Sequence, residues 1–286
     1  MRHILVTGAS SGIGLALCKL LVRDHGCHVY LGSRNTAKGE ACLKGIVEAV
    51  PEAAGKIEVV TLDVVDTASI KAAAESIKAK GVSLYALVNN AGVGLAQPDA
   101  PNGAEGILKT NFYGVKNVTD AFLDLIDAKE GRIVNVSSGA ASGFVKRQDE
   151  PTKTLFSNPD LTFDELEAAI KAHVTAGNVG VGNGYGLSKA SLSALTLIQA
   201  RELPHLVVTS LSPGFIDTPM TKGFGARLTP EEGCVSSIKC LFEKVTSGFY
   251  YGSDGLRSPL TMTRDPGMPE YEGEANPAQE KYNRAS

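Results

Sequence analysis

The sequence of 286 residues has no excess of basic side chains. It contains 28 Lys and Arg residues against 31 Asp and Glu residues, which gives a formal net charge of −3. Nothing in this balance would neutralise a nucleic-acid backbone or an anionic membrane surface. We therefore expect neither nucleic acid nor a membrane among its partners.

Paired cysteines and metal-ligand spacings are also absent. No CxxC pair occurs, and an odd number of scattered cysteines favours reduced thiols in a reducing compartment. The five histidines form neither HExxH nor another metal-binding pattern, so we predict no metal. The cysteines concerned are Cys18, Cys27, Cys42, Cys234 and Cys240.

Long apolar runs are missing as well. No run approaches the length of about 18 residues that suggests a membrane span. The first strand is expected at about residue 3, which leaves no room for a signal or transit sequence, so the expected location is the cytoplasm. With 43% hydrophobic residues the chain can bury a sizeable core, and we favour one domain.

What the sequence does contain is a regular alternation of short β-branched runs and longer stretches of helical period. This pattern predicts an α/β fold with a doubly wound parallel sheet (Rossmann fold). The expected strands are 3–7, 28–32, 57–62, 85–89, 132–137, 207–212 and 248–251. The expected helices are 12–24, 36–49, 67–80, 104–127, 185–202 and 230–245.

Two stretches interrupt the alternation. Residues 139–184 read as an insertion, with a polar loop, a helix over 162–176 and a Gly-rich run; Thr162 and Glu165 form a capping-box pattern at the start of that helix. From Arg264 the composition turns to Pro, Glu, Gly and Asn. We expect one domain over 1–263 and a mobile tail over 264–286, with a cap over the active site or a partner-binding segment as alternatives.

A glycine-rich segment joins the first strand to the first helix. Glycines allow a tight turn and close backbone approach, so that free N–H groups at the helix start can hold a pyrophosphate. Tight strand-to-helix packing alone would also explain them. The candidate cofactor-binding residues here are Gly8, Ser10, Ser11, Gly12, Ile13 and Gly14.

This spacing resembles the TGxxxGxG loop of the short-chain dehydrogenase/reductase family, and further family motifs follow in order. Taken singly, the acid Asp63 is equally explained as the start of a loop, and the asparagines Asn89 and Asn90 as a turn. The resemblance implies that Asp63 and Val64 contact adenine, and that the NNAG segment lies beside it. The corresponding residues of that segment are Asn90, Ala91 and Gly92, after Asn89.

The second strand ends without the acid that NAD-selective sites place near the ribose 2′-OH. Ser33 takes that position and Arg34 follows, whose guanidinium suits a 2′-phosphate. We therefore expect NADP(H), with an ordinary solvated arginine as the alternative. Many NADP(H)-preferring relatives carry a basic residue where this chain has Ser11.

Tyr185 and Lys189 are four residues apart at the start of a predicted helix, so they project from one face. An ammonium near a phenol stabilises the phenolate and lowers its pKa toward the working range of a proton donor. Alone, the spacing also fits a packing aromatic and a surface lysine. The resemblance implies that Tyr185 is the proton donor and that Lys189 also binds the nicotinamide ribose.

Two more catalytic candidates come from the same resemblance. Ser138 is the second serine of a pair that ends the fifth strand, and it would polarise the substrate carbonyl; Ser137 is the runner-up. Asn111 stands in mid-helix, where asparagine is a poor helix former. The resemblance implies that Asn111 helps to bind a water linking Lys189 to solvent; an interhelical hydrogen bond is the alternative.

The segment after the sixth strand resembles the family's PG segment, which binds the nicotinamide carboxamide. Its matching residues are Pro213, Gly214, Ile216 and Thr218. A Pro-Gly turn after a strand is unremarkable in itself, so only its position in the motif order gives it weight.

Tyr185 follows Ser138 by 47 positions, and the helix-bearing insertion between them resembles the carbonyl reductase branch. That resemblance implies a monomer that reduces ketones, aldehydes or quinones with NADPH. Candidate substrate contacts besides Ser138 are Val93, Phe144, Phe215 and Met220, each of which also fits core packing. The alternatives are a specialised secondary-metabolite or steroid reductase and a non-catalytic NADP(H) sensor; the four catalytic candidates argue against the sensor.

Overall fold

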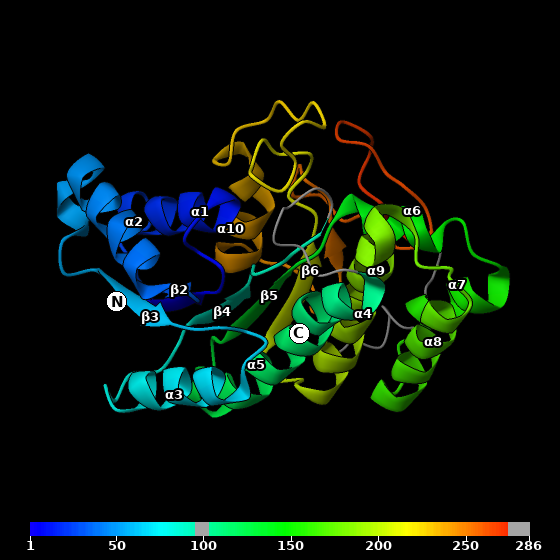
Figure 1. The fold of residues 1–286 in the computed structure, drawn as a ribbon, viewed down its shortest axis with the longest axis horizontal. Coiled ribbons are helices and arrows are strands. Elements are labelled where there is room, and N and C mark those ends of the chain that lie inside the picture. The colour runs from blue at the N-terminus through cyan, green and yellow to red at the C-terminus, as the bar shows by residue number, and fades with distance from the viewer. Residues whose placement is uncertain (95–102, 274–286) are drawn as a thin grey trace.

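The computed structural model describes residues 1–94 and 103–273, and these form a parallel sheet covered by helices on both faces (Figure 1). The strand order is β3-β2-β1-β4-β5-β6-β7, which confirms the doubly wound sheet. The strands are β1 (His3–Val6), β2 (His28–Ser33), β3 (Ile57–Thr61), β4 (Ala86–Asn89), β5 (Arg132–Val136), β6 (Val207–Leu211) and β7 (Tyr250–Tyr251).

Two helical layers bury the sheet. One face carries α1 (Gly12–Arg23), α2 (Thr36–Ala49) and α10 (Val235–Phe242) (Figure 1). The other carries α3 (Thr67–Lys78), α4 (Gly103–Leu108), α5 (Val115–Phe122) and α9 (Val181–Glu202). Because both faces are covered, successive residues of a strand are all apolar: Ile4, Leu5 and Val6 are each 0% exposed.

The predicted helix over 104–127 is not continuous. After α4 the chain passes through a π-helical segment, η2 (Lys109–Gly114), before α5 and a 3-10 turn, η3 (Leu123–Leu125). Further 3-10 turns are η1 (Pro51–Ala53) and η4 (Glu232–Cys234). The π segment holds Asn111, whose side chain bonds a neighbouring loop. In the described part of the chain no helix is long and apolar enough to cross a membrane.

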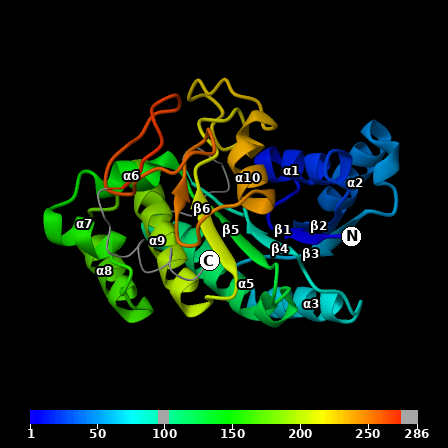
Figure 2. The same cartoon turned by 180° about the vertical axis from the view of Figure 1, so that it is seen from behind.

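The insertion contains more helix than the sequence predicts. The expected helix is present as α8 (Phe163–Thr175), and its capping box forms between Thr162 and Glu165. The expected polar loop before it instead contains α6 (Gly139–Val145) and α7 (Glu150–Ser157), which begin where Ser138 and Asp149 accept N–H groups of the first turn. Figure 2 shows the three helices packed at the side of α9.

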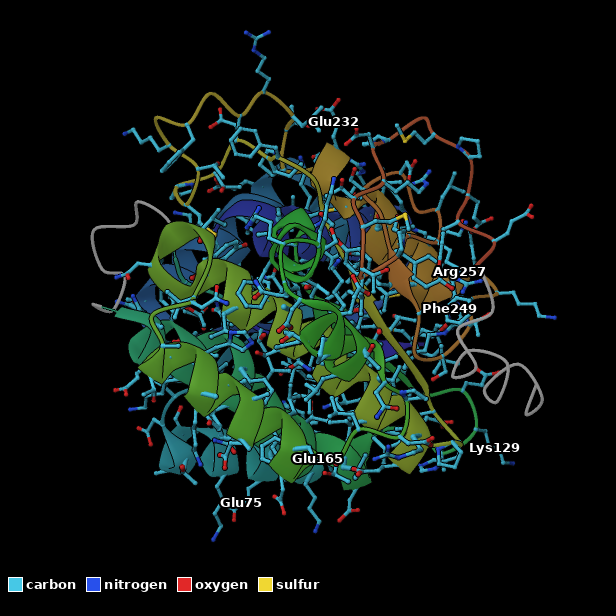
Figure 3. All side chains as sticks on the ribbon, turned by 90° about the vertical axis from the view of Figure 1, so that its right-hand side faces the viewer. Glu75, Lys129, Glu165, Glu232, Phe249 and Arg257 are labelled. Atoms are coloured by element: carbon cyan, nitrogen blue, oxygen red, sulfur yellow. The ribbon has the colours of Figure 1, made fainter. Side chains whose placement is uncertain are left out.

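Residues 264–273 make contacts with the rest of the domain, and the mobility expected of the tail from Arg264 stays a prediction. The Arg264 side chain is 5% exposed and forms two bonds to Asp254, of 2.6 and 3.0 Å. Tyr271 donates its N–H to the carbonyl of Arg257, whose guanidinium lies 3.9 Å from the centre of the Phe249 ring (Figure 3). Residues 274–286 lie outside the described part of the chain.

Candidate active site

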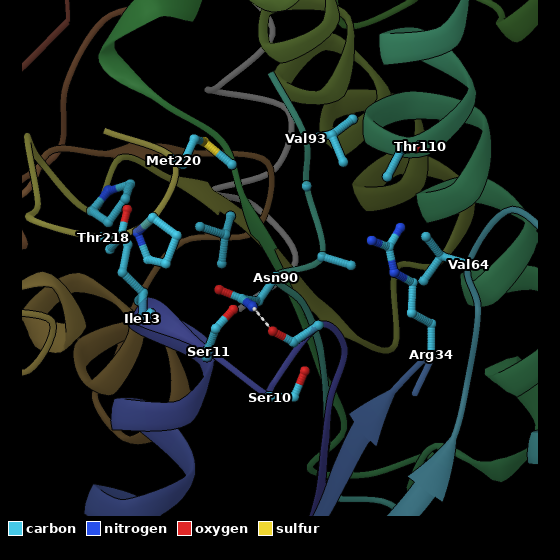
Figure 4. A pocket seen from close by; sticks show the side chains of 18 of the residues that line it. Ser10, Ser11, Ile13, Arg34, Val64, Asn90, Val93, Thr110, Thr218 and Met220 are labelled. Carbon is cyan, nitrogen blue, oxygen red and sulfur yellow. Dashed lines mark hydrogen bonds between the residues drawn. The ribbon is translucent and has the colours of Figure 1, made fainter. Parts of the chain in front are cut away.

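A cleft of about 370 Å³ opens at the carboxyl ends of the central strands, where the strand order reverses between β1 and β4. Ligands bind at this switch point in open α/β sheets. Arg34 and Val64 lie at one end, and Thr218 and Met220 at the other (Figure 4). The remaining predicted residues that line it are Gly8, Ser10, Ser11, Gly12, Ile13, Gly14, Asp63, Asn90, Ala91, Gly92, Val93, Tyr185, Lys189 and Pro213.

The glycine-rich loop is pressed against the NNAG segment. Gly8 has φ +62°, and a Cβ on it would lie 2.7 Å from the Cα of Ala91. The side-chain amide of Asn90 donates to the Thr7 carbonyl over 2.8 Å. Ser11, the N-cap of α1, makes no side-chain cap bond, so the first N–H groups of that helix remain available for a pyrophosphate.

Two cations line the end of the cleft beside Val64, whereas the sequence predicts one. Lys38, in the first turn of α2, lines the cleft with Arg34, and both are exposed. Ser33 does not reach the cleft: it is 1% exposed, and its hydroxyl donates to the carbonyl of Asn35 over 2.8 Å. The prediction of a cofactor contact for the Ser33 side chain is therefore corrected.

The side of the cleft expected to contact adenine is built from the end of β3 and the π segment. The N–H of Asp63 donates to Ser69 over 2.9 Å, and its carboxylate accepts the N–H of Val65 over 3.1 Å. These bonds fix the turn that presents Val64. Residues here that sequence reasoning missed are Leu62, Val65 and Thr110.

Tyr185 begins the regular part of α9. Residues 182–184 just before it have positive φ, which breaks the helix and sets the direction of its first regular turn. Tyr185 is 8% exposed and Lys189 is 3% exposed. The Lys189 ammonium donates to the carbonyl of Val136 over 2.8 Å and lies 5.8 Å from the centre of the Tyr185 ring.

Gly94 is a further part of this group that the motifs do not reveal. A Cβ at Gly94 would lie 2.5 Å from Cδ2 of Tyr185, and its φ is +140°. Only glycine lets this loop pass so close to the ring. The importance of Gly94 can be recognised only in the folded chain, because Gly94 and Tyr185 are far apart in sequence.

Burial dominates the acid–base properties of the pair. It raises the pKa of Tyr185, while a hydrogen bond from the Ser138 hydroxyl opposes the rise. Burial also lowers the pKa of Lys189 to about 8. We expected Lys189 to lower the pKa of the phenol. With these protein groups alone the pKa is raised, because the free-energy cost of removing water from a buried phenolate exceeds the stabilisation that its neighbours provide.

The two serines after β5 differ in their hydrogen-bond partners. The Ser137 hydroxyl is occupied, because it donates to the Lys189 carbonyl over 3.0 Å and pairs with Ser193 over 2.8 Å. The Ser138 hydroxyl accepts the N–H of Ala140 over 3.1 Å and is the hydrogen-bonding partner of Tyr185. Val136 and Ser137 line the cleft, whereas Ser138 is not among its lining residues. Ser138 is nevertheless the serine whose hydroxyl lowers the pKa of Tyr185.

Asn111 braces the loop below Lys189. Its Oδ1 accepts the N–H of Val93 over 2.9 Å, and its Nδ2 donates to the Val93 carbonyl over 2.9 Å and to Ser188 over 3.0 Å. Protein groups therefore use both N–H groups of the amide and one lone pair of its oxygen, and the water-binding role expected for Asn111 stays a prediction. The π turn widens the helix at this point, as such turns often do at functional sites.

The PG segment reaches the cleft in part. Pro213, Thr218, Pro219 and Met220 line it. Ile216 instead packs inward at 2% exposure, and Gly214 faces Ser253. These two do not line the cleft because the segment turns away between Pro213 and Thr218.

Two of the four substrate candidates are not in the cleft. Phe144 is 0% exposed, with its ring 5.9 Å from Phe156 and 5.3 Å from His173, so it belongs to the core of the insertion. Phe215 is 50% exposed and does not line the cleft. Val93 and Met220 do line it.

Comparison with known proteins places these features in a family context. A model described as short chain dehydrogenase matches residues 2–148. The chain is 32% identical to (+)-neomenthol dehydrogenase of Arabidopsis thaliana, over 83% of this chain and 90% of that protein. It is 31% identical to carbonyl reductase (NADPH) 1 of Pongo abelii, over 83% and 90%. The structure of salutaridine reductase from Papaver somniferum matches with TM-score 0.76 at 27% identity, covering 88% of this chain and 99% of that one.

Proposed function

Because this chain belongs to the short-chain dehydrogenase/reductase family, we propose that it reduces the carbonyl group of a small ketone, aldehyde or quinone with NADPH. One observation carries the proposal. Tyr185 and Lys189 line the same cleft as the glycine-rich loop, and Ser138 hydrogen-bonds to Tyr185. A proton donor and a dinucleotide cradle therefore face one space.

The bound nicotinamide would supply the hydride that the carbonyl carbon receives. The chain's own groups act on the carbonyl oxygen. The Ser138 hydroxyl donates to this oxygen and polarises it, and Tyr185 then gives it a proton. Lys189, as an ammonium, stabilises the phenolate that this transfer leaves behind. Burial of the pair excludes water that would compete for the proton.

The preference for NADPH rests on charge. Arg34 and Lys38 line the end of the cleft beside Val64, and a 2′-phosphate is the dianionic group that distinguishes NADP(H) from NAD(H) there. A guanidinium and an ammonium both suit phosphate. The name of the Pongo abelii relative also specifies NADPH.

The first experiment compares NADPH oxidation by the unaltered protein and Tyr185→Phe, with a panel of aldehydes, ketones and quinones. Loss of a general acid should lower kcat roughly 10²–10⁴-fold. Tyr113→Phe is the matched control, because its hydroxyl bonds Glu167 outside the cleft. Turnover that persists in Tyr185→Phe would remove Tyr185 as the donor. Tight NADPH binding without turnover of any carbonyl would favour the non-catalytic sensor.

A second candidate is a specialised reductase of one terpenoid, alkaloid or steroid ketone. The similarity to (+)-neomenthol dehydrogenase and to salutaridine reductase of Papaver bracteatum favours it. The same substrate panel separates the two candidates. A general carbonyl reductase should accept many small carbonyls with similar kcat/KM, whereas a specialised enzyme should prefer one bulky ketone by orders of magnitude.

We also propose a monomer. The insertion covers one face of α9 and the π segment: Phe163 stacks on Phe112 with centroids 5.8 Å apart, and Arg201 donates to the Pro159 carbonyl over 2.7 Å. A second copy would have to displace these contacts to pack there. Sedimentation at micromolar concentration should give the monomer mass, and a dimer would refute the proposal. We place the protein in the cytoplasm, where unpaired thiols such as its five stay reduced.

A further inference from the structure

Thr221 lies in the turn that follows the PG segment, and the reaction proposed above does not use it. The turn brings Thr218, Pro219 and Met220 to the cleft, whereas Thr221 is half-buried and does not line it. Thr218 and Met220 lie at the end of the cleft opposite Arg34 (Figure 4). A dinucleotide whose 2′-phosphate is bound by Arg34 would therefore direct its nicotinamide toward this turn.

The turn is held from two sides. The N–H of Asp217 donates to the carbonyl of Leu228 over 2.8 Å. On the other side, the methyl group of Thr218 lies against the glycine-rich loop, since a Cβ on Gly12 would be 3.3 Å from Thr218 Cγ2. Neither of these contacts involves the Thr221 hydroxyl. Removing that hydroxyl should therefore leave the turn attached to the domain.

The Thr221 hydroxyl bonds to groups of this turn. Its oxygen accepts the N–H of Thr218 over 3.0 Å, and it donates its proton to the carbonyl of Ile216 over 2.5 Å. The carbonyl of Thr218 is a more distant acceptor, at 3.2 Å. The oxygen atoms of the Thr218 and Thr221 hydroxyls lie 3.3 Å apart.

Counting protons fixes the direction of the bond between the two hydroxyls. A threonine hydroxyl has one proton to donate and two lone pairs that accept. Because Thr221 gives its proton to the Ile216 carbonyl, Thr218 is the donor of the 3.3 Å bond. Thr221 then donates once and accepts twice, which uses its hydroxyl completely. The Thr218 oxygen keeps its lone pairs, so it meets a ligand in the cleft as an acceptor.

We propose that Thr221 is a positioning residue, which accepts a hydrogen bond from Thr218 and thereby presents the Thr218 oxygen to the carboxamide N–H of a bound nicotinamide. The inference rests on the proposed NADPH-dependent reaction. The carboxamide nitrogen carries the N–H donors of the nicotinamide, so an acceptor at this end of the cleft favours a carboxamide over a group without N–H. Holding the carboxamide also fixes the ring that carries the hydride.

The test compares two dinucleotides that differ in this donor. In the 3-acetylpyridine analogue of NADP⁺, a methyl group replaces the carboxamide NH₂. Titration calorimetry gives the Kd of each. The unaltered protein should bind NADP⁺ about fivefold more tightly than the analogue, which is the usual effect of one hydrogen bond. In Thr221→Val the two Kd values should differ by less than about twofold, because the Thr218 hydroxyl is no longer held as an acceptor.

Two variants serve as controls. Thr221→Ser keeps the hydroxyl and should keep the fivefold ratio. Thr229→Val should keep it too, because the Thr229 hydroxyl donates to Glu232 over 2.9 Å and does not line the cleft. A merely structural role of Thr221 would weaken both dinucleotides by the same factor. An unchanged ratio in Thr221→Val, a lost ratio in Thr221→Ser, or no preference in the unaltered protein would overturn the inference.

Adenosine 2′,5′-bisphosphate shows whether the effect is confined to the nicotinamide end. It carries the 2′-phosphate but no nicotinamide, so its Kd should change less than about twofold in Thr221→Val. A larger change would overturn the inference, because the whole cleft would then be disturbed. If the unaltered protein reduces no carbonyl but keeps the fivefold ratio, the proposed reaction fails and the inference stands. If Thr221→Val does not fold, Thr221→Ala removes the same hydroxyl and takes its place.

Discussion

Removing the two cations at the end of the cleft beside Val64 should reduce the use of NADPH without affecting the use of NADH. Arg34 and Lys38 are both exposed, so their attraction for a 2′-phosphate is reduced by water. A hydrogen bond from a guanidinium to a charged group contributes about 1.5–3 kcal/mol, and an ammonium 4 Å from a unit charge in water contributes about 1 kcal/mol.

These magnitudes convert to rates. A loss of about 2 kcal/mol predicts a fall of about 30-fold in kcat/KM for NADPH in Arg34→Ala. Lys38→Ala, at about 1 kcal/mol, should lower it about 5-fold. Values for NADH should stay within about twofold, because NADH has no phosphate at this position. Raising the salt concentration should weaken the wild-type preference in the same direction.

The assay is the initial rate of carbonyl reduction with each dinucleotide under identical conditions. Lys44→Ala removes the same charge from the same helix, but Lys44 pairs with Glu48 over 3.8 Å and does not line the cleft, so both rates should stay constant. If Arg34→Ala lowers the NADH and NADPH rates by the same factor, the cations do not bind the 2′-phosphate and the reasoning is wrong.

Two predictions concern the buried pair. Burial lowers the pKa of Lys189 to about 8 from 10.5, so between these pH values the unfolded chain binds more protons than the folded one. The free energy of unfolding of the unaltered protein should therefore rise with pH across this window relative to Lys189→Met, by at most about 3 kcal/mol in urea denaturation. Gly94→Ala should lower kcat about tenfold or more in steady-state assays, because the new Cβ would strike the Tyr185 ring and the backbone is strained.

The controls for these two predictions are simple. A stability difference between the unaltered protein and Lys189→Met that does not change with pH would show that the ammonium is not desolvated. Gly45→Ala is the matched glycine change, because nothing lies within 4 Å of the added Cβ, and it should leave kcat unchanged. Equal kcat values for both glycine variants would contradict the close approach of Gly94 to the ring.

Much of the architecture is readable in the sequence because it is encoded over short distances. The β-branched runs predicted the strands, since a strand buried on both faces must be apolar at successive residues. The capping box of Thr162 and Glu165 marked the start of α8 from residues three apart. The spacing of Tyr185 and Lys189 placed both on one helical face, and both line the cleft.

The tertiary structure decided what local spacing leaves open. Ser137 and Ser138 are adjacent and chemically identical, and only the approach of α9 determines which hydroxyl is occupied by packing. Phe144 follows the catalytic segment closely enough to be a candidate substrate contact, yet in the fold its ring packs in the core of the insertion. Gly94 matters because of a ring that comes 91 positions later in the chain.

The physical reason is the range of the interactions. Helical and strand periodicity, capping and glycine turns depend on neighbours within a few residues, so the sequence by itself determines the elements and the order of the motifs. The direction in which Ser33 or Asn111 points depends on packing against distant segments. The Ser212 hydroxyl accepts the N–H of Gly139 only because the end of β6 meets the start of α6 in the folded chain.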